Sequence, residues 1–232
     1  MSEAMYVNGT YLTNHPTWHI EDSLWKARHV VTMLERAKLH PRTICEIGCG
    51  AGAILSALQT LLPRECEFWG YDIAPHAIDL CRPKANERLH FTLGSPLDDP
   101  NAHFDVVLLL DVVEHVDDYL SWLRALRPKA TYKVLHLPLD LSVQAVLRPG
   151  RLLVERRLSG HLHYFTKETA LATLADVEYE VLDYFYTAGT VDLRVKSLKS
   201  NLLKLPRRFL FALTQDWAVR LLGGYSLMVL AA

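Results

Sequence analysis

Cysteine is scarce in this 232-residue sequence, which holds four cysteines and no C-x-x-C pair. Neither a zinc knuckle nor a redox-active dithiol is therefore expected. The sequence also has no run of 18 apolar residues, and its first residues lack the basic and apolar regions of a signal peptide. These absences predict a cytoplasmic protein without a transmembrane segment.

Glycine and proline are infrequent, and the net charge is small. The two residue types together number 22 of 232, and half of all residues are hydrophobic, which excludes collagen-like and disordered classes. There are 25 basic and 26 acidic residues, a formal charge of −1. This balance argues against nucleic acid as a partner bound by bulk charge.

Apolar strands alternate with amphipathic helices along the first two thirds of the chain. The strands are nearly continuous apolar runs, as at 106–110, which is typical of a parallel sheet covered on both faces. The fold class predicted is therefore a doubly wound α/β domain. The expected helices are 23–39, 51–61, 75–82 and 117–126, and the expected strands are 43–47, 66–72, 88–93, 104–110 and 130–137.

The alternation loosens after Pro138. Residues 140–158 are irregular or helical, and a basic helical stretch covers 193–221, where Pro206 is expected to divide two helices. A final strand at 224–230 follows two glycines and can pair antiparallel. A helix is expected at 166–175 and a strand at 177–186.

The strongest motif is IleCysGluIleGlyCysGlyAlaGly at 44–52, where a strand turns into a helix. Its glycines let backbone amides face a ligand, and the helix N-terminus favours negative groups. Asp72 follows at the end of the next strand, where a carboxylate can bind ribose hydroxyls. The turn alone leaves two interpretations open, a dinucleotide site or a site for another nucleoside cofactor.

Together with the AspValValGluHisVal segment at 111–116, these features resemble the class I S-adenosylmethionine-dependent methyltransferases, particularly the ubiquinone-type O-methyltransferases. The resemblance covers roughly residues 22–186 and the last strand. It implies a seven-stranded sheet in the order 3-2-1-4-5-7-6 with an antiparallel last strand, and S-adenosyl-L-methionine as cofactor. Ser95 stands where the family tends to carry an Asp near adenine. The cofactor-binding residues implied are Glu46, Gly48, Cys49, Gly50, Gly52, Asp72, Ile73, Ser95 and Asp111.

Two histidines are the candidate general bases, His115 and His163. Three roles are open for His115: packing at the helix entrance, contact with cofactor or substrate, or binding of a divalent ion with Asp111 and Glu114. No metal is predicted. His161 is a candidate substrate contact, and its spacing from His163 places both on one side of an extended segment.

The chain is expected to form a single methyltransferase domain over residues 1–232. Residues 1–40 form an N-terminal lid segment and helix in this prediction, with Trp18 and His19 as substrate contacts; the alternative is that Trp18 and Trp25 only pack this helix onto the sheet. Residues 140–165 and 190–222 are predicted to be insertions that cover the substrate. The second holds Arg194, Lys196, Lys199, Lys204, Arg207 and Arg208.

The function predicted is methyl transfer to a small-molecule acceptor, most simply at a hydroxyl oxygen; a phenol, a sugar hydroxyl and an anionic or lipid-linked intermediate all remain open. One alternative is an NAD(P)-dependent oxidoreductase. Another is a non-catalytic module that binds a nucleoside cofactor and presents a basic interaction surface. The amphipathic basic helices leave open a peripheral membrane contact, a homodimer interface and a solvated face.

Overall fold

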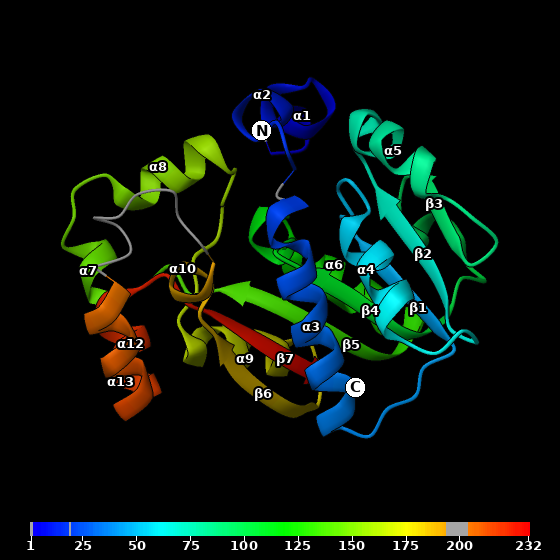
Figure 1. The fold of residues 1–232 in the computed structure, drawn as a ribbon. Helices are drawn as coiled ribbons and strands as arrows, with labels where there is room; N and C mark the ends of the chain where they lie inside the picture. Colours follow the sequence, from blue (N-terminus) through cyan, green and yellow to red (C-terminus); the bar gives the residue numbers. More distant parts are fainter. Residues whose placement is uncertain (1, 19, 194–203) are drawn as a thin grey trace.

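A single seven-stranded sheet organises the chain, in the order β3-β2-β1-β4-β5-β7-β6 (Figure 1). The computed structural model describes residues 2–18, 20–193 and 204–232. The strands are β1 Thr43–Ile47, β2 Glu67–Asp72, β3 Leu89–Leu93, β4 Phe104–Leu110, β5 Ala130–Pro138, β6 Val181–Thr187 and β7 Ser226–Ala231.

The strands from β3 to β5 are parallel, and β7 runs antiparallel between β5 and β6. In the centre of the sheet, Glu46 of β1 lies opposite Gly70 of β2 and Leu108 of β4. Gly223 and Gly224 both have positive φ before β7, at 63° and 79°, conformations that favour glycine. The predicted fold class, strand order and antiparallel last strand are confirmed.

Helices cover both faces of the sheet, as apolar strands in a parallel sheet require. One core layer lies beneath α3, α4 and α5, around Met33, Leu55 and Phe68. The other lies beneath α6, α9 and α13, around Leu123, Leu174 and Val219. These helices are α3 Ile20–Arg36, α4 Ala53–Leu61, α5 Pro75–Cys81, α6 Tyr119–Leu126, α9 Lys167–Asp176 and α13 Gln215–Leu222.

Helices outside these two layers lie around the carboxyl ends of the strands and at one end of the sheet (Figure 1). They are α1 Ser2–Val7, α2 Thr10–Asn14, α7 Val143–Val146, α8 Arg151–Leu158, α10 Gly189–Asp192 and α12 Lys204–Leu213. The roles predicted for the lid and the two substrate-cover insertions stay predictions. Within residues 2–18, 20–193 and 204–232, no helix is long and apolar enough to cross a bilayer.

Element boundaries differ from the sequence prediction by up to four residues; the strand expected at 177–186, for example, is β6 Val181–Thr187. The helix expected at 23–39 begins at Ile20 and ends at Arg36. Pro206 lies in the first turn of α12, where a missing N–H costs no helical hydrogen bond, and α12 is separated from α13 at Thr214. Residues 194–203 lie outside the described part of the chain, so a division between two helices near Pro206 stays a prediction. Arg194, Lys196 and Lys199 lie outside the described residues.

Candidate active site

The glycine turn between β1 and α4 is built so that only glycine fits. Gly48, Gly50 and Gly52 have φ values of 71°, 53° and 69°, which side-chain-bearing residues rarely adopt. A Cβ on Gly48 would lie 2.7 Å from Val112, and one on Gly52 would lie 2.5 Å from Phe91. The turn therefore holds its backbone in a conformation that other residues would distort.

Asp72 joins the end of β2 to this turn. Its carboxylate accepts hydrogen bonds from the backbone N–H groups of Gly50 and Ala74, each at 2.8 Å. Burial raises the pKa of Asp72 to about 6, against the opposing effect of these backbone hydrogen bonds. Each oxygen keeps a lone pair that can accept a further hydrogen bond. Asp72 therefore both fixes the turn and presents an acceptor beside it.

The other predicted cofactor residues surround the turn with different exposures. Ile73 is 43% exposed at the rim, whereas Cys49 is buried. Glu46 is also buried, and burial raises its pKa well above the ordinary value; its Oε2 has no hydrogen-bond partner among the described residues. The Ser95 hydroxyl accepts from the N–H of Leu97 in a helical cap. Ser95 thus already has a local structural role.

Asp111 follows β4 and belongs to a partly buried ionic network. Its oxygens lie 2.6 Å from Lys26 Nζ and 2.6 Å from His136 Nδ1, and His136 Nε2 contacts the Thr187 hydroxyl at 2.8 Å. Burial disfavours its charge, but the charges of His136 and Lys26 hold the pKa of Asp111 well below its usual range. Asp111 therefore ties helix α3 to the ends of three strands, β4, β5 and β6.

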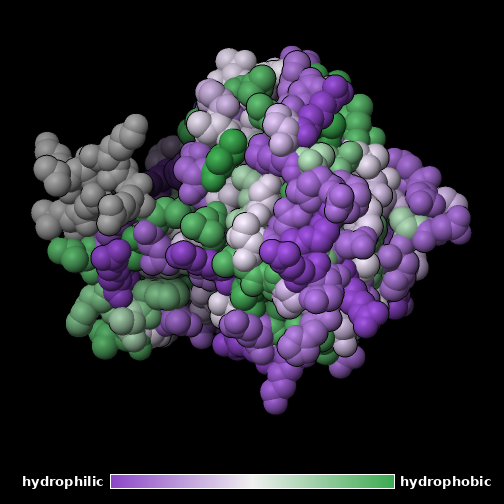
Figure 2. All heavy atoms as spheres, turned by 45° about the vertical axis from the view of Figure 1, so that its right-hand side comes forward, coloured by the Kyte–Doolittle hydropathy of each residue, from purple (hydrophilic) through white to green (hydrophobic). Residues whose placement is uncertain are grey.

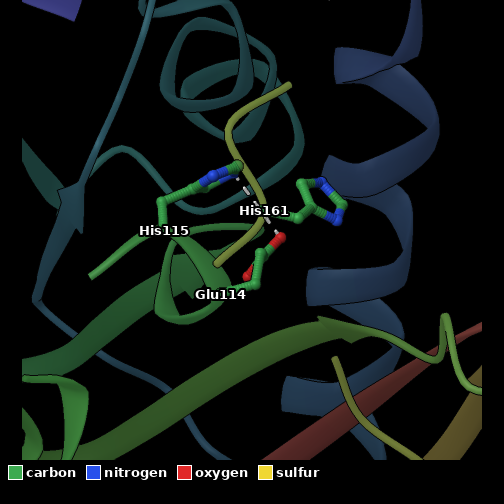
Figure 3. A group of neighbouring side chains, drawn as sticks. All are labelled: Glu114, His115 and His161. Carbon is green, nitrogen blue, oxygen red and sulfur yellow. Dashed lines mark ion pairs between the residues drawn. The ribbon is translucent and has the colours of Figure 1, made fainter. Parts of the chain in front are cut away.

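Glu114, His115 and His161 form the most concentrated group of titratable side chains near this edge of the sheet (Figure 3). One ligand atom from each lies within 4.8 Å of the others, and Glu114 Oε1 is 3.8 Å from His115 Nε2. Both Glu114 oxygens and His115 Nδ1 are buried and find no hydrogen-bond partner in the described part of the chain. Buried polar atoms are normally satisfied, so this cluster is built to meet an incoming group.

The pKa values of the three side chains are shifted in different directions by burial and by neighbouring charges. Burial and the Asp111 charge raise the pKa of Glu114 to about 8. Burial and the His161 charge lower the pKa of His115 to about 4. Burial opposes protonation of His161, but its hydrogen bond to Asp140 at 2.7 Å and the Glu114 charge raise its pKa to about 9. His115 is thus a neutral imidazole at physiological pH.

The structure separates His161 from His163. His163 Nε2 donates to the Val116 carbonyl at 2.9 Å, and its ring packs on Tyr119 with centroids 4.4 Å apart. His161 instead packs edge-on against His115, with centroids 5.0 Å apart. The two histidines thus have different partners, and residues 160–165 form no regular strand, so the one-sided arrangement expected of an extended segment stays a prediction.

Aromatic side chains from the N-terminus cover the site. Tyr6 and Tyr11 have centroids 4.7 Å apart, Tyr11 lies 5.0 Å from Trp18, and Tyr6 packs edge-on against His115 at 5.8 Å. A Cβ on Gly50 would lie 3.6 Å from the Trp18 ring. We call α1, α2 and Trp18 the N-terminal cover. Trp18 thus belongs to the site; His19 falls outside the described residues.

Sequence reasoning missed four residues of this region: Tyr6, Tyr11, Lys26 and His136. Helices α1 and α2 have six and five residues, too short for a periodic signal. His136 did leave a signal in the sequence, because it is a polar residue between Leu135 and Leu137 in the apolar strand β5.

Comparisons with known proteins agree with this geometry. Residues 45–131 match the model of a family described as a methyltransferase domain. The chain is 24% identical over 189 residues to ajmaline N-methyltransferase of Rauvolfia serpentina, covering 71% of this chain and 64% of that protein. It is 34% identical over 87 residues to a ubiquinone biosynthesis O-methyltransferase of Ruegeria pomeroyi, covering 35% of this chain and 34% of that protein.

Among solved structures, magnesium protoporphyrin IX methyltransferase from Synechocystis PCC 6803, determined with bound SAH, superposes with a TM-score of 0.56 at 14% identity. The alignment covers 90% of this chain and 82% of that one. The chain therefore spans less than two thirds of the length of these two curated relatives, but the structural alignment covers most of the Synechocystis methyltransferase. The resemblance to class I methyltransferases inferred from the sequence is confirmed.

Proposed function

For a chain that carries a class I methyltransferase domain, we propose S-adenosylmethionine-dependent transfer of a methyl group to a hydroxyl oxygen of a small molecule. The observation that carries the proposal is the pairing of the glycine turn with the Asp72 carboxylate, 2.8 Å from the Gly50 N–H. S-adenosylmethionine supplies a methyl group on a positively charged sulfur, which is displaced in line by a nucleophile.

The residues of the turn fit this donor. The N–H groups at the start of α4 can meet its carboxylate, and the free lone pairs of Asp72 can accept from its ribose hydroxyls. The N-terminal cover, through Trp18, excludes water from this region. The NAD(P)-dependent oxidoreductase is less well supported. The family model that residues 45–131 match is a methyltransferase domain, and the antiparallel strand β7 is the one that the resemblance to methyltransferases implies.

Oxygen as the methyl acceptor is supported by the cluster of Glu114, His115 and His161. A hydroxyl is a weak nucleophile until it loses its proton. His115 is the base in this proposal: the acceptor oxygen attacks the methyl carbon, the bond from carbon to sulfur breaks with its electron pair staying on sulfur, and the hydroxyl proton passes to the imidazole.

A second role for the same cluster is favoured by one observation, the convergence of one carboxylate and two imidazoles within 4.8 Å. Mixed nitrogen and oxygen ligands suit Mn²⁺, Fe²⁺ or Zn²⁺ better than Mg²⁺. Such an ion would supply a positive charge that lowers the pKa of a bound hydroxyl. Asp111 is not part of this set, because its oxygens are held by Lys26 and His136.

A screen of hydroxyl, amine and carbon acceptors with methyl-labelled donor tests the proposal. We expect label on an oxygen of a phenol or sugar; transfer only to nitrogen would overturn the choice of acceptor atom. Dialysis against EDTA separates the two roles of the cluster. Full activity after dialysis leaves His115 as the base, whereas loss that Mn²⁺ or Zn²⁺ restores assigns the cluster to a cation.

A further inference from the structure

Exposed apolar side chains are concentrated at one end of the molecule, on α7, α12 and α13. Nineteen large apolar residues are exposed among the described residues, and eight of them fall within the 24 residues of 143–147 and 204–222. We call these eight the apolar surface: Val143, Val146, Leu147, Leu205, Phe209, Leu213, Trp217 and Leu221. Scattered exposed residues need no explanation, but a concentration of this kind marks an interaction site.

Helix α12 has two different faces. Leu205, Phe209 and Leu213 recur every four residues and are 55%, 67% and 67% exposed, so they form one outward stripe. The opposite face is anchored: Phe211 stacks on Tyr225 with centroids 4.9 Å apart, and Arg207 donates to Gln144 at 2.7 Å. The helix is therefore held in place without using its apolar stripe.

Neighbouring helices add further exposed apolar residues. Trp217 and Leu221 lie four residues apart on α13 and are 59% and 38% exposed, and α13 packs against both α12 and α7. On α7, Val146 and the following Leu147 are 64% and 75% exposed. Figure 2 shows hydrophobic residues gathered at the end of the molecule that α12 and α13 form in Figure 1.

Basic residues accompany the apolar surface. The segments 143–158 and 204–222 contain eight basic residues and only two acidic ones, in a chain whose formal charge is −1. Arg148, Arg156, Arg157 and Arg208 are exposed, whereas Arg220 is already paired with Glu168. Both acids already have cationic partners: Glu155 contacts Arg151, and Asp216 contacts Lys167. The excess positive charge is therefore available to an anionic partner.

We propose that this end of the molecule docks onto the surface of a membrane rich in anionic phospholipids. Apolar side chains of α7, α12 and α13 would enter the interface while the surrounding arginines meet headgroup phosphates, the arrangement of interfacial amphipathic helices. A second copy of the chain fits less well. A two-fold interface would bring identical basic patches together, and like charges across an interface oppose association.

Docking here would also bring the bilayer close to the candidate active site. Helix α8 connects the two regions: the Leu158 carbonyl accepts hydrogen bonds from Asn14 and His15 of the N-terminal cover region, each at 3.1 Å. A lipid-linked acceptor could then reach the cluster from the membrane. This last step rests on the proposed function, whereas docking itself does not.

Co-sedimentation of the full chain with vesicles tests docking without any need for activity. We expect binding to phosphatidylcholine vesicles that contain phosphatidylglycerol, weaker binding to phosphatidylcholine alone, and release at high salt. A double variant, Phe209→Ser with Leu213→Ser, should lose binding at least tenfold. Leu182→Ser on β6, where the leucine is 46% exposed, is the matched control and should bind like the unaltered protein.

A charge variant, Arg148→Gln with Arg157→Gln, should bind several-fold more weakly and with a shallower salt dependence. Circular dichroism checks that all variants are folded. Absence of binding at low salt, equal binding to both vesicle types, or unaltered binding by the double variant would overturn the proposal. So would a dimer in solution that the double variant dissociates, because the apolar surface would then belong to a second copy.

Discussion

Lys26 and Asp111 form a partly buried ion pair, with Nζ and Oδ2 2.6 Å apart, that ties the first long helix to the end of β4. The pair carries no catalytic chemistry in this account. It fixes the position of α3, which follows the end of the N-terminal cover, relative to the strand that leads into Glu114 and His115.

Replacement of Lys26 by Met should lower the free energy of unfolding by about 2 kcal/mol, because Asp111 would lose a charged hydrogen-bond partner while keeping His136. Urea denaturation measures the change. Lys84→Met is the control, since Lys84 is half-buried and its ammonium donates to the Leu80 carbonyl of the same helical segment rather than to a carboxylate. Equal stability of the two variants would show that the Lys26–Asp111 pair contributes nothing.

Gly52→Ala should be far more damaging than Gly150→Ala. Both glycines have positive φ, 69° and 76°, so each alanine costs about 1 kcal/mol in backbone strain. Only at Gly52 would the new Cβ also meet a ring, Phe91 at 2.5 Å; nothing lies within 4 Å at Gly150. Gly52→Ala should lower both the unfolding temperature and the affinity for S-adenosylhomocysteine more than Gly150→Ala does. Equal values for the two variants would mean that the turn tolerates a side chain at Gly52.

Asp72 should make binding of S-adenosylhomocysteine pH-dependent. Its pKa is raised from 3.8 to about 6, so the neutral carboxyl stabilises the unliganded fold at low pH, and this contribution is lost as the pH rises through 6. Ribose hydroxyls donate to the ionised form, so affinity should fall about tenfold per pH unit below 6. Isothermal titration calorimetry measures this affinity at each pH. The Asp72→Asn variant should bind S-adenosylhomocysteine weakly at every pH. If its affinity changed with pH as that of the unaltered protein does, Asp72 would not be the source of the pH dependence.

His115→Ala should lower kcat by about 100-fold or more without changing affinity for S-adenosylhomocysteine, as expected for loss of a general base. His163→Ala should change kcat by only a few-fold, because its Nε2 is held by the Val116 carbonyl. Steady-state kinetics on the acceptor found in the screen decide between them. A larger loss in His163→Ala would reverse the assignment.

The sheet could be predicted from the sequence because its signals are local. Continuous apolar runs identify the strands, the glycines at 48, 50 and 52 locate the first turn, and the glycines at 223 and 224 locate the last strand. Each of these features is set by a few consecutive residues. Strand order then followed from the family that the motifs resemble.

The cluster of Glu114, His115 and His161 could be predicted only in part, because its members come from distant segments. Glu114 and His115 were found beside each other, but 45 residues separate His115 from His161, and α6, β5, α7 and α8 intervene. The sequence paired His161 with its neighbour His163, whereas the fold pairs it with His115. Contacts of this range depend on the path of the chain, which no local pattern specifies.

The most direct test of the account is a calorimetric titration of the full chain with S-adenosylhomocysteine and, separately, with NAD⁺. We expect one S-adenosylhomocysteine per chain, no binding of NAD⁺, and at least tenfold weaker S-adenosylhomocysteine binding after Asp72→Asn, with Asp79→Asn on the exposed side of α5 behaving like the unaltered protein. Binding of NAD⁺ alone, or S-adenosylhomocysteine binding that ignores Asp72, would contradict the assignment of the glycine turn to a methyl donor.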